Sequence, residues 1–231
     1  MSTFANIAVI IPAYNEENAV GKVVAALPKS LVKTIIVVNN NSNDQTALAA
    51  QKAGATVVDE PQQGYGFACL RGMAYLQEMS EKPDIVVFVD ADYSDYPEEL
   101  PKLVAPILEK NVAMVIGSRA IGAKEKGSMT PQQVFGNWLA TRLIKWLYGV
   151  SFTDLGPFRA IRYSDLLALN MQDQTYGWTV EMQVKAAKKG LKVEEVPVSY
   201  RIRVGQSKIS GTIKGTILAG YKIITTIFKY K

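Results

Sequence analysis

The most hydrophobic run of the chain ends in two acidic residues and reads Ile85-Val86-Val87-Phe88-Val89-Asp90-Ala91-Asp92. Its five consecutive apolar residues predict a buried strand over residues 85–89. Comparable runs predict further strands over residues 7–11, 34–38, 55–58 and 112–116. The stretches between them predict helices over residues 16–27, 44–53, 66–79 and 97–108. This alternation predicts an α/β fold with a mostly parallel central sheet and flanking helices.

The second half of the chain continues with longer helices. Helical stretches cover residues 132–148 and 179–189, strand-like stretches cover residues 156–161 and 191–198, and the tail has a helical period. The sequence contains no internal repeat and no long flexible linker. We therefore expect one domain over residues 1–209, followed by an amphipathic, basic C-terminal helix over residues 210–231.

The composition limits the chemistry that the chain can perform. Its 231 residues include one cysteine, Cys69, and no histidine. A single cysteine excludes a disulfide framework and a cysteine-based zinc site within one chain. The lack of histidine excludes Ser-His-Asp triads and histidine metal ligands. Catalysis must therefore use carboxylates, lysine, arginine, tyrosine or a bound metal.

The positive charge is concentrated near the C-terminus. The formal net charge is +5, and the seven basic residues after Glu195 are accompanied by no acidic residue. Such a tail indicates contact with the phosphates of a nucleotide, a nucleic acid or an anionic lipid. The N-terminal segment lacks the basic region of a signal peptide, and no apolar run reaches the roughly 18 residues of a spanning helix. These features predict a cytoplasmic protein.

Asp90 and Asp92 follow a predicted strand at the point where it ends. In open α/β sheets, ligands bind beyond the carboxyl ends of the strands. Two carboxylates spaced i, i+2 at such a position can bind one divalent cation. Oxygen ligands suit Mg²⁺ or Mn²⁺, which bridge a protein to a diphosphate. The alternative interpretation is a polar strand end followed by an ordinary loop.

Three more loops carry polar or glycine-rich motifs. Pro12-Ala13-Tyr14-Asn15-Glu16-Glu17 follows the first strand, where its glutamates also suit the first turn of a helix. Asn39-Asn40-Asn41-Ser42-Asn43-Asp44 follows the second strand, and runs of asparagine are also typical of turns. Gly64-Tyr65-Gly66 lacks the third glycine of a dinucleotide fingerprint, because Cys69 stands there, so a Rossmann NAD site is not expected. We expect these glycines to allow close approach of a neighbouring loop or ligand.

The ordered set of these loops resembles the family 2 inverting glycosyltransferases of the GT-A fold. Within that family it is most similar to the branch of dolichyl- and polyprenyl-phosphate mannosyl- or glucosyltransferases. Three segments downstream agree with the resemblance. They are Gly117-Ser118-Arg119, Asp154-Leu155-Gly156-Pro157-Phe158-Arg159-Ala160 and Arg203-Val204-Gly205-Gln206-Ser207-Lys208.

The resemblance implies a role for each matching position. The nucleotide base and ribose would be bordered by Pro12, Tyr14, Glu16, Val38 and Asn40. Asp90 and Ala91 would contact the ribose and diphosphate, and Asp92, together with Asp90, would hold the metal. The phosphates of donor or acceptor would be bound by Arg119, Arg203 and Lys208. Such a set suits a diphosphate leaving group, which develops negative charge during the reaction.

Two features depart from the family pattern. Asn39 and Asn40 stand where the family usually has two aspartates, which leaves the base of the donor nucleotide open. The segment from Arg203 to Lys208 is one residue shorter than usual, so Arg201 is an alternative phosphate ligand to Arg203.

The sequence therefore predicts a metal-dependent inverting glycosyltransferase. It would transfer a hexose from a nucleotide-sugar of the GDP-mannose or UDP-glucose type to a polyprenyl or dolichyl phosphate, an anionic nucleophile that needs no general base. The alternative acceptor is a sugar or lipid hydroxyl, which requires a carboxylate base, and Asp154 is the candidate. A nucleotide-binding module without catalysis would not need the acidic pair, and no base-stacking motif supports a nucleic-acid partner.

Two helical segments combine apolar and basic side chains, as helices at a membrane surface do. Residues 137–148 contain Trp138, Arg142, Lys145 and Trp146. In the tail, an apolar stripe (Ile213, Ile217, Tyr221, Ile224 and Phe228) adjoins a lysine stripe (Lys214, Lys222 and Lys229). We expect peripheral attachment to the cytoplasmic face of a membrane. The alternative is that these segments pack onto the body of the protein or onto a second copy in a homo-oligomer.

Overall fold

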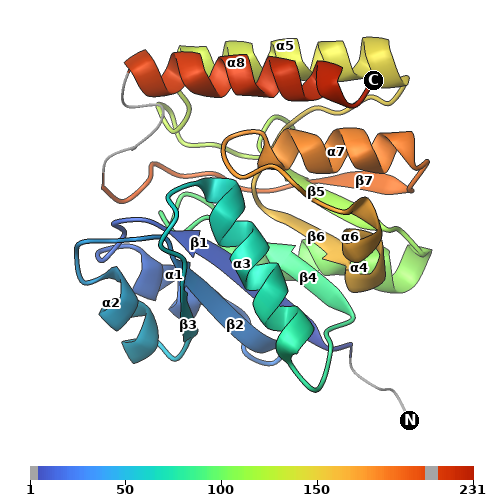
Figure 1. The fold of residues 1–231 in the computed structure, drawn as a ribbon. Coiled ribbons are helices and arrows are strands. Elements are labelled where there is room, and N and C mark those ends of the chain that lie inside the picture. Colours follow the sequence, from blue (N-terminus) through green and yellow to red (C-terminus); the bar gives the residue numbers. More distant parts are fainter. Residues whose placement is uncertain (1–4, 206–212) are drawn as a thin grey trace.

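The computed structural model describes residues 5–205 and 213–231, and within them seven strands form one central sheet (Figure 1). The strands are β1 (Ile7–Ala13), β2 (Val32–Asn39), β3 (Thr56–Asp59), β4 (Ile85–Phe88), β5 (Met114–Ser118), β6 (Arg159–Arg162) and β7 (Val193–Pro197). Their order across the sheet is β3-β2-β1-β4-β6-β5-β7. β6 runs antiparallel to β4 and β5, and the other neighbouring pairs are parallel. The predicted α/β fold with a mostly parallel sheet is confirmed.

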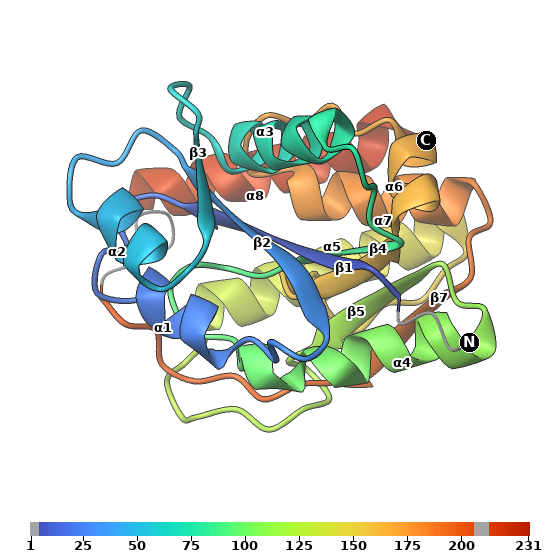
Figure 2. The same ribbon diagram turned by 90° about the horizontal axis from the view of Figure 1, so that it is seen from below.

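Helices cover both faces of this sheet (Figure 2). One face carries α1 (Val20–Ala26), α2 (Thr46–Lys52) and α4 (Leu100–Lys110), and the other carries α3 (Tyr65–Glu78), α6 (Tyr163–Leu169) and α7 (Trp178–Lys188). Successive side chains of a strand point to opposite faces. In β1, Ala8 and Ile10 therefore pack on the α3 side, whereas Val9 and Ile11 pack on the α1 side. Burial on both faces is typical of parallel sheets.

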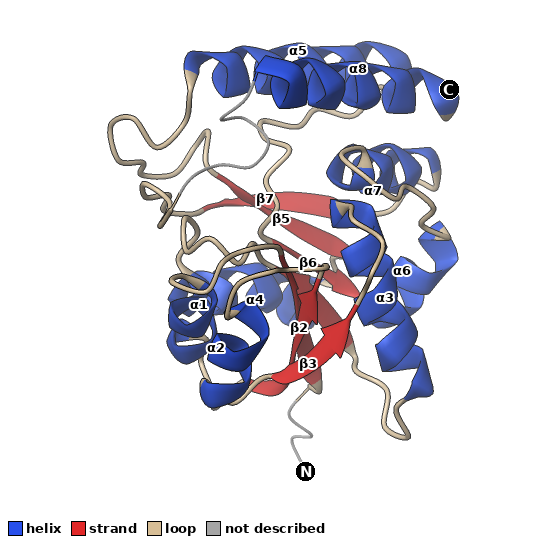
Figure 3. Cartoon of the chain, turned by 60° about the vertical axis from the view of Figure 1, so that its left-hand side comes forward, coloured by secondary structure: helices blue, strands red, loops and turns tan. Residues whose placement is uncertain are grey.

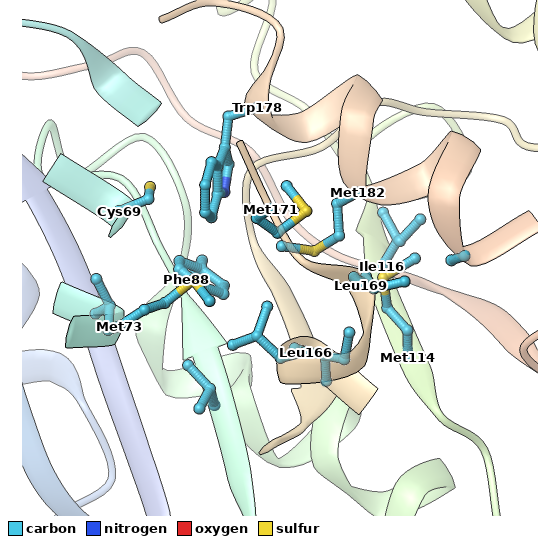
Figure 4. Close-up of a cluster of buried hydrophobic side chains, with 14 of the residues drawn as sticks. Cys69, Met73, Phe88, Met114, Ile116, Leu166, Leu169, Met171, Trp178 and Met182 are labelled. Atoms are coloured by element: carbon cyan, nitrogen blue, oxygen red, sulfur yellow. The ribbon is translucent and has the colours of Figure 1, made fainter. Parts of the chain in front are cut away.

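Two aromatic rings lie in the core between the sheet and α7 (Figure 4). Phe88 of β4 and Trp178 of α7 meet edge to face, with ring centroids 5.9 Å apart. Cys69 of α3 lies in the same buried cluster. Burial raises the pKa of its thiol well above the ordinary value, so Cys69 acts here as a small apolar packing residue.

An outer layer of two helices lies beyond α7 (Figures 1 and 3). These are α5 (Pro131–Tyr148) and α8 (Ile213–Lys229). α5 begins with a capping box, in which Thr130 Oγ1 accepts from the Gln133 amide and the Gln133 side chain accepts from the Thr130 amide. The tail is fastened to the body by the Tyr230 hydroxyl, which donates to Glu181 at 2.7 Å, and by the Tyr148 hydroxyl, which donates to the Ile227 carbonyl.

The helical prediction for the tail is confirmed, but its two stripes differ in their surroundings. Ile217, Tyr221, Ile224 and Phe228 are exposed, so in this chain the apolar stripe does not pack onto the body. Lys222 was expected in a free lysine stripe, but its ammonium lies 3.0 Å from the Asp173 carboxylate. The predicted stripe positions Ile213 and Lys214 have side chains outside the described part. In the part of the chain that is described, no helix is both long and apolar enough to cross a membrane.

Some helices and strands begin at other residues than those predicted from the sequence. The helix predicted from residue 16 begins at Val20, because the Glu16 carbonyl first accepts from the Ala19 amide in a turn. The strand predicted over residues 156–161 begins at Arg159, after the Gly156-Pro157 loop. α6 was not predicted from the sequence.

Candidate active site

The carboxyl ends of β1, β2 and β4 meet at a pocket of about 410 Å³. Parallel strands end at the same edge of a sheet, so loops that are distant in the sequence converge there. The predicted site residues that line this pocket are Pro12, Tyr14, Glu16, Asn40, Asp90, Ala91, Asp92 and Arg203. We call this the donor pocket, after the nucleotide-sugar donor that the sequence leads us to expect.

A second pocket, of about 320 Å³, adjoins the first and is bordered by α5 and α8. The residues that line both pockets are Tyr65, Asp90, Asp92, Tyr176 and Arg203. We call the second cavity the acceptor pocket, after the acceptor that the sequence leads us to expect. The acidic pair lines both cavities.

Asp90 and Asp92 have different hydrogen-bond partners. Asp92 Oδ1 accepts from the amide and the hydroxyl of Ser94, at 2.9 and 2.5 Å. Asp90 Oδ1 accepts from the Tyr65 hydroxyl at 3.0 Å. Burial, and next the charge of Asp92, raise the pKa of Asp90 to about 7, while the Tyr65 hydrogen bond opposes this rise.

This acidic pair fits a divalent cation. Two carboxylates that repel one another are stabilised when a cation lies between them, and hard oxygen ligands suit Mg²⁺ and Mn²⁺. Among the residues that the structure describes, no group of three acidic or cysteine side chains could hold a metal ion. Asp90 and Asp92 would therefore supply two carboxylates and leave the remaining coordination positions to water and substrate.

Arg203 connects the acidic pair to the loop after β1. Its guanidinium lies 2.7 Å from Glu16 Oε1 and 3.1 Å from Asp92 Oδ2. The Val204 amide donates to the Asp92 carbonyl at 2.9 Å, which holds this segment against the strand end. Glu16 thus lines the donor pocket as an ion-pair partner, not as a residue of the first helical turn.

Arg201, the alternative to Arg203, lies elsewhere. Its guanidinium is sandwiched between the rings of Tyr93 and Tyr96, 3.7 Å from each centroid. It also donates to the Asp95 carbonyl at 3.0 Å. The structure brings Arg203 to both pockets and gives Arg201 a packing position, so the geometry favours Arg203 as the phosphate ligand.

Arg119 and Asp154 form a buried ion pair. Asp154 Oδ2 accepts from the Arg119 amide and Nε, and Oδ1 accepts from Nη2, each at 2.8 Å. Asp154 is fully buried and lines neither pocket, whereas Arg119 lines the acceptor pocket. The expectation that Asp154 acts as a general base does not fit this geometry, because its carboxylate is turned to Arg119 and away from the cavities.

Three other residues were predicted to line the site, and the sequence motifs alone could not specify where their side chains lie. Val38 is buried in the core on the α3 side of the sheet and does not line the donor pocket. Asn40 ties the pocket wall together, because its Nδ2 donates to the Gln62 carbonyl and its Oδ1 accepts from the Gly64 amide. Lys208 lies outside the described residues.

Sequence reasoning missed two tyrosines that line both pockets. Tyr65 was quoted only as part of a glycine motif, and no local signal marked Tyr176. We expected Gly64 and Gly66 to allow close approach of a neighbouring loop or ligand, and the structure confirms this for a neighbouring loop. A Cβ atom on Gly66 would lie 2.0 Å from the Asp173 carbonyl oxygen, so the loop that carries Tyr176 can approach α3 only at a glycine.

Residues 8–168 match the family described as Glycosyl transferase family 2. The chain belongs to glycosyl transferase family 2. It is 37% identical over 221 residues to an uncharacterized glycosyltransferase of Mycobacterium tuberculosis, a match that covers 92% of this chain and 94% of that protein. It is 32% identical over 211 residues to a dolichyl-phosphate hexose transferase of Haloferax volcanii, covering 90% and 88% of the two chains. The family 2 chain is therefore a transferase enzyme, as the sequence predicted.

A solved structure confirms the GT-A-like fold of this family 2 chain. Glucosyl-3-phosphoglycerate synthase from Mycobacterium tuberculosis, in complex with Mn²⁺, uridine diphosphate and phosphoglyceric acid, matches with a TM-score of 0.77 at 22% identity. The match covers 98% of this chain and 78% of the synthase. At this identity the likeness to the synthase establishes the fold of the present chain. The substrates of the chain have to be inferred from its own pockets.

Proposed function

We propose that this family 2 enzyme transfers a hexose, with inversion, from a nucleotide-sugar of the GDP-mannose or UDP-glucose type to a polyprenyl or dolichyl phosphate. The observation that carries the proposal is the pair of adjoining pockets with Asp90 and Asp92 at their junction. The relative in Haloferax volcanii is named for a dolichyl-phosphate substrate, which supports the choice of acceptor.

The donor pocket suits a nucleoside diphosphate-sugar. Tyr14, Asn40 and Gly64 line the donor pocket and not the acceptor pocket, and they would contact the nucleoside, while Asp90 and Asp92 would hold Mg²⁺ or Mn²⁺. When bound, this cation would neutralise the charge that develops on the leaving diphosphate. Arg203 is already placed beside Asp92, and its charge would also stabilise the diphosphate.

The acceptor pocket suits a phosphate nucleophile. In the described part of the chain, the carboxylates that line it are Asp90 and Asp92, which we assign to the metal. A hydroxyl acceptor would need a separate base, whereas a phosphate monoester is already anionic at neutral pH. Arg119 lines the same cavity, and the Asp154 ion pair holds its guanidinium in place.

The outer layer suits attachment to a membrane surface. Exposed apolar side chains on α5 include Phe135, Trp138 and Trp146, and those on α8 include Ile217 and Tyr221. Aromatic and aliphatic side chains near exposed cations are typical of peripheral helices at anionic lipid. We propose that this layer brings the acceptor pocket to the cytoplasmic face of a membrane that contains the lipid phosphate.

The proposal is tested by measuring sugar transfer from radiolabelled UDP-glucose and GDP-mannose in the presence of Mg²⁺ or Mn²⁺. The acceptors are undecaprenyl phosphate, undecaprenol and 3-phosphoglycerate. We expect transfer to undecaprenyl phosphate alone, and none by the Asp92→Asn variant. Transfer to the alcohol or to 3-phosphoglycerate, with none to the lipid phosphate, would contradict the proposed acceptor.

A further inference from the structure

Two glycines occupy helix interiors without a packing reason. Gly136 lies within α5 and Gly220 lies within α8. Glycine is unfavourable at such positions, because the backbone loses more freedom there than with any other residue. A Cβ atom placed on either glycine would meet no atom of the described residues within 4 Å, so these surroundings do not require glycine.

Other glycines of the same chain are explained by packing. A Cβ on Gly156 would lie 2.4 Å from the Gly117 carbonyl oxygen, and one on Gly122 would lie 1.9 Å from the Val198 carbonyl oxygen. Those positions exclude a side chain because backbone fills the space. Gly136 and Gly220 instead face open space.

That space belongs to the acceptor pocket. Gly136, Gly220 and the neighbouring Ala219 all line it, on the side formed by the outer layer. At the opposite side, by the ends of the strands, the same pocket is lined by Arg119 and Arg203. The pocket therefore has two arginines next to the acidic pair, and small residues interspersed with Gln132, Gln133, Asn137 and Ile223 where α5 and α8 adjoin.

Contacts next to Gly136 and near the C-terminal ends of the two helices hold α5 and α8 in place. Asn137 Nδ2 donates to the Thr153 carbonyl at 2.9 Å, and its Oδ1 accepts from the Leu155 amide at 2.8 Å. These bonds hold α5 at the loop that carries Asp154. The Tyr148 hydroxyl bond to the Ile227 carbonyl joins α5 to α8 near their other ends. The space at Gly136 and Gly220 is thus a feature of the packed structure.

We propose that Gly136 and Gly220 keep open a passage between α5 and α8 for the hydrocarbon chain of the acceptor. This inference rests on the proposed function and extends it to acceptor specificity. The phosphate lies by Arg119 and Arg203, and the first isoprene units leave the pocket between the two glycines toward the exposed apolar side chains of the outer layer. The two glycines therefore determine whether an acceptor with a long, branched chain can bind.

The test compares Gly136→Leu and Gly220→Leu with the matched variants Gly136→Ala and Gly220→Ala. Leucine is a good helix former and reaches into the passage, whereas alanine adds one methyl group with room to spare. The acceptors are undecaprenyl phosphate and isopentenyl phosphate, whose single isoprene unit ends before the passage. Donor binding to each variant is measured by calorimetry with UDP-glucose or GDP-mannose and Mg²⁺.

We expect the leucine variants to lower kcat/KM for undecaprenyl phosphate by more than about tenfold, because chain contacts are lost, and for isopentenyl phosphate by less than about threefold. Donor affinity should stay near wild type, and the alanine variants should lose less kcat/KM for undecaprenyl phosphate than the leucine variants. An equal loss of kcat/KM for both acceptors would overturn the proposed passage. Wild-type kcat/KM for undecaprenyl phosphate in the leucine variants would overturn it as well. Failure of the wild-type chain to use undecaprenyl phosphate at all would instead overturn the proposed acceptor, and the passage with it.

Discussion

At the residue scale, the ionisation of the Asp90 carboxyl matters most for metal binding. Its pKa of about 7 lies above the ordinary value of an aspartate, first through burial and then through the charge of Asp92. A proton and a divalent cation compete for this carboxylate. As the pH falls below about 7, Asp90 takes up a proton and metal affinity falls. Above that pH the carboxylate is ionised, and affinity levels off.

Tyr65→Phe tests this titration directly. The Tyr65 hydroxyl bond favours the ionised form of Asp90, so its removal should raise the pKa of that carboxyl further. In the pH profile of kcat/KM at limiting Mg²⁺, we expect the acidic limb of the variant to move to higher pH while the alkaline plateau stays near wild type. Tyr75→Phe, on the same helix and packed against the core, is the control. An unshifted limb would contradict the assigned role of Tyr65.

Arg201 and Arg203 lie two positions apart in the sequence, yet we expect substitution of Arg203 to lower activity and substitution of Arg201 to lower stability. Under the proposed function, Arg203→Ala would remove a charge-assisted contact to phosphate worth about 1.5–3 kcal/mol, so kcat/KM should fall between about tenfold and a hundredfold. Arg201→Ala removes a guanidinium stacked on Tyr93 and Tyr96, so it should lower the free energy of unfolding by about 1–2 kcal/mol. Kinetic assays and urea unfolding of both variants measure the contrast, and the reverse pattern would refute the assignment.

At the scale of elements, the strand-end loops could be predicted from the sequence and the exact side-chain partners could not. Asp90 and Asp92 were placed correctly, because a hydrophobic strand and the rule of carboxyl ends suffice to locate them. Val38 was misplaced, since the direction of a strand side chain depends on the face that each helix covers. Asp154 was a candidate base, and the sequence could not show that its carboxylate pairs with Arg119, which lies 35 residues away in the chain. Tyr176 enters the site on a loop whose position is set by contact with Gly66, a long-range effect without local signal.

The helices of the outer layer allow a prediction about stability. The methyl group of an alanine at Gly136 or Gly220 would meet no atom of the described residues within 4 Å, so helix propensity should decide its effect. Each substitution should raise the free energy of unfolding by roughly 0.5–1 kcal/mol. Urea unfolding followed by circular dichroism measures this. A decrease would show that these positions do not have the helical, uncrowded environment described above.

At the scale of the whole molecule, α5 and α8 lie side by side in a layer apart from the sheet (Figure 3). Both helices line the acceptor pocket and carry exposed apolar side chains. The body contributes the residues that we propose for catalysis, and the outer layer contributes the surface that we propose to meet lipid. The sequence indicated both helices, but only the structure shows that Lys222 is held by Asp173 while Tyr221 is exposed.

Vesicle flotation tests the outer layer. We expect the full chain to bind anionic vesicles, and the double variant Trp146→Ser/Tyr221→Ser to bind at least about tenfold more weakly, because burial of each aromatic side chain contributes about 1.5–3 kcal/mol. Leu108→Ser is a matched control, since Leu108 is 55% exposed on α4, on another face of the molecule. Equal binding by the wild type and the double variant would exclude this surface as the lipid contact.

The central claim is that Asp90 and Asp92 hold a divalent cation and thereby the diphosphate of the donor. Calorimetric titration of UDP and GDP into the wild type and into Asp92→Asn, each with Mn²⁺ and with EDTA, tests it most directly. The account predicts that one of these nucleotides binds the wild type in the presence of Mn²⁺, and that EDTA or Asp92→Asn weakens binding by more than about tenfold. Binding of equal strength in all conditions would contradict the account.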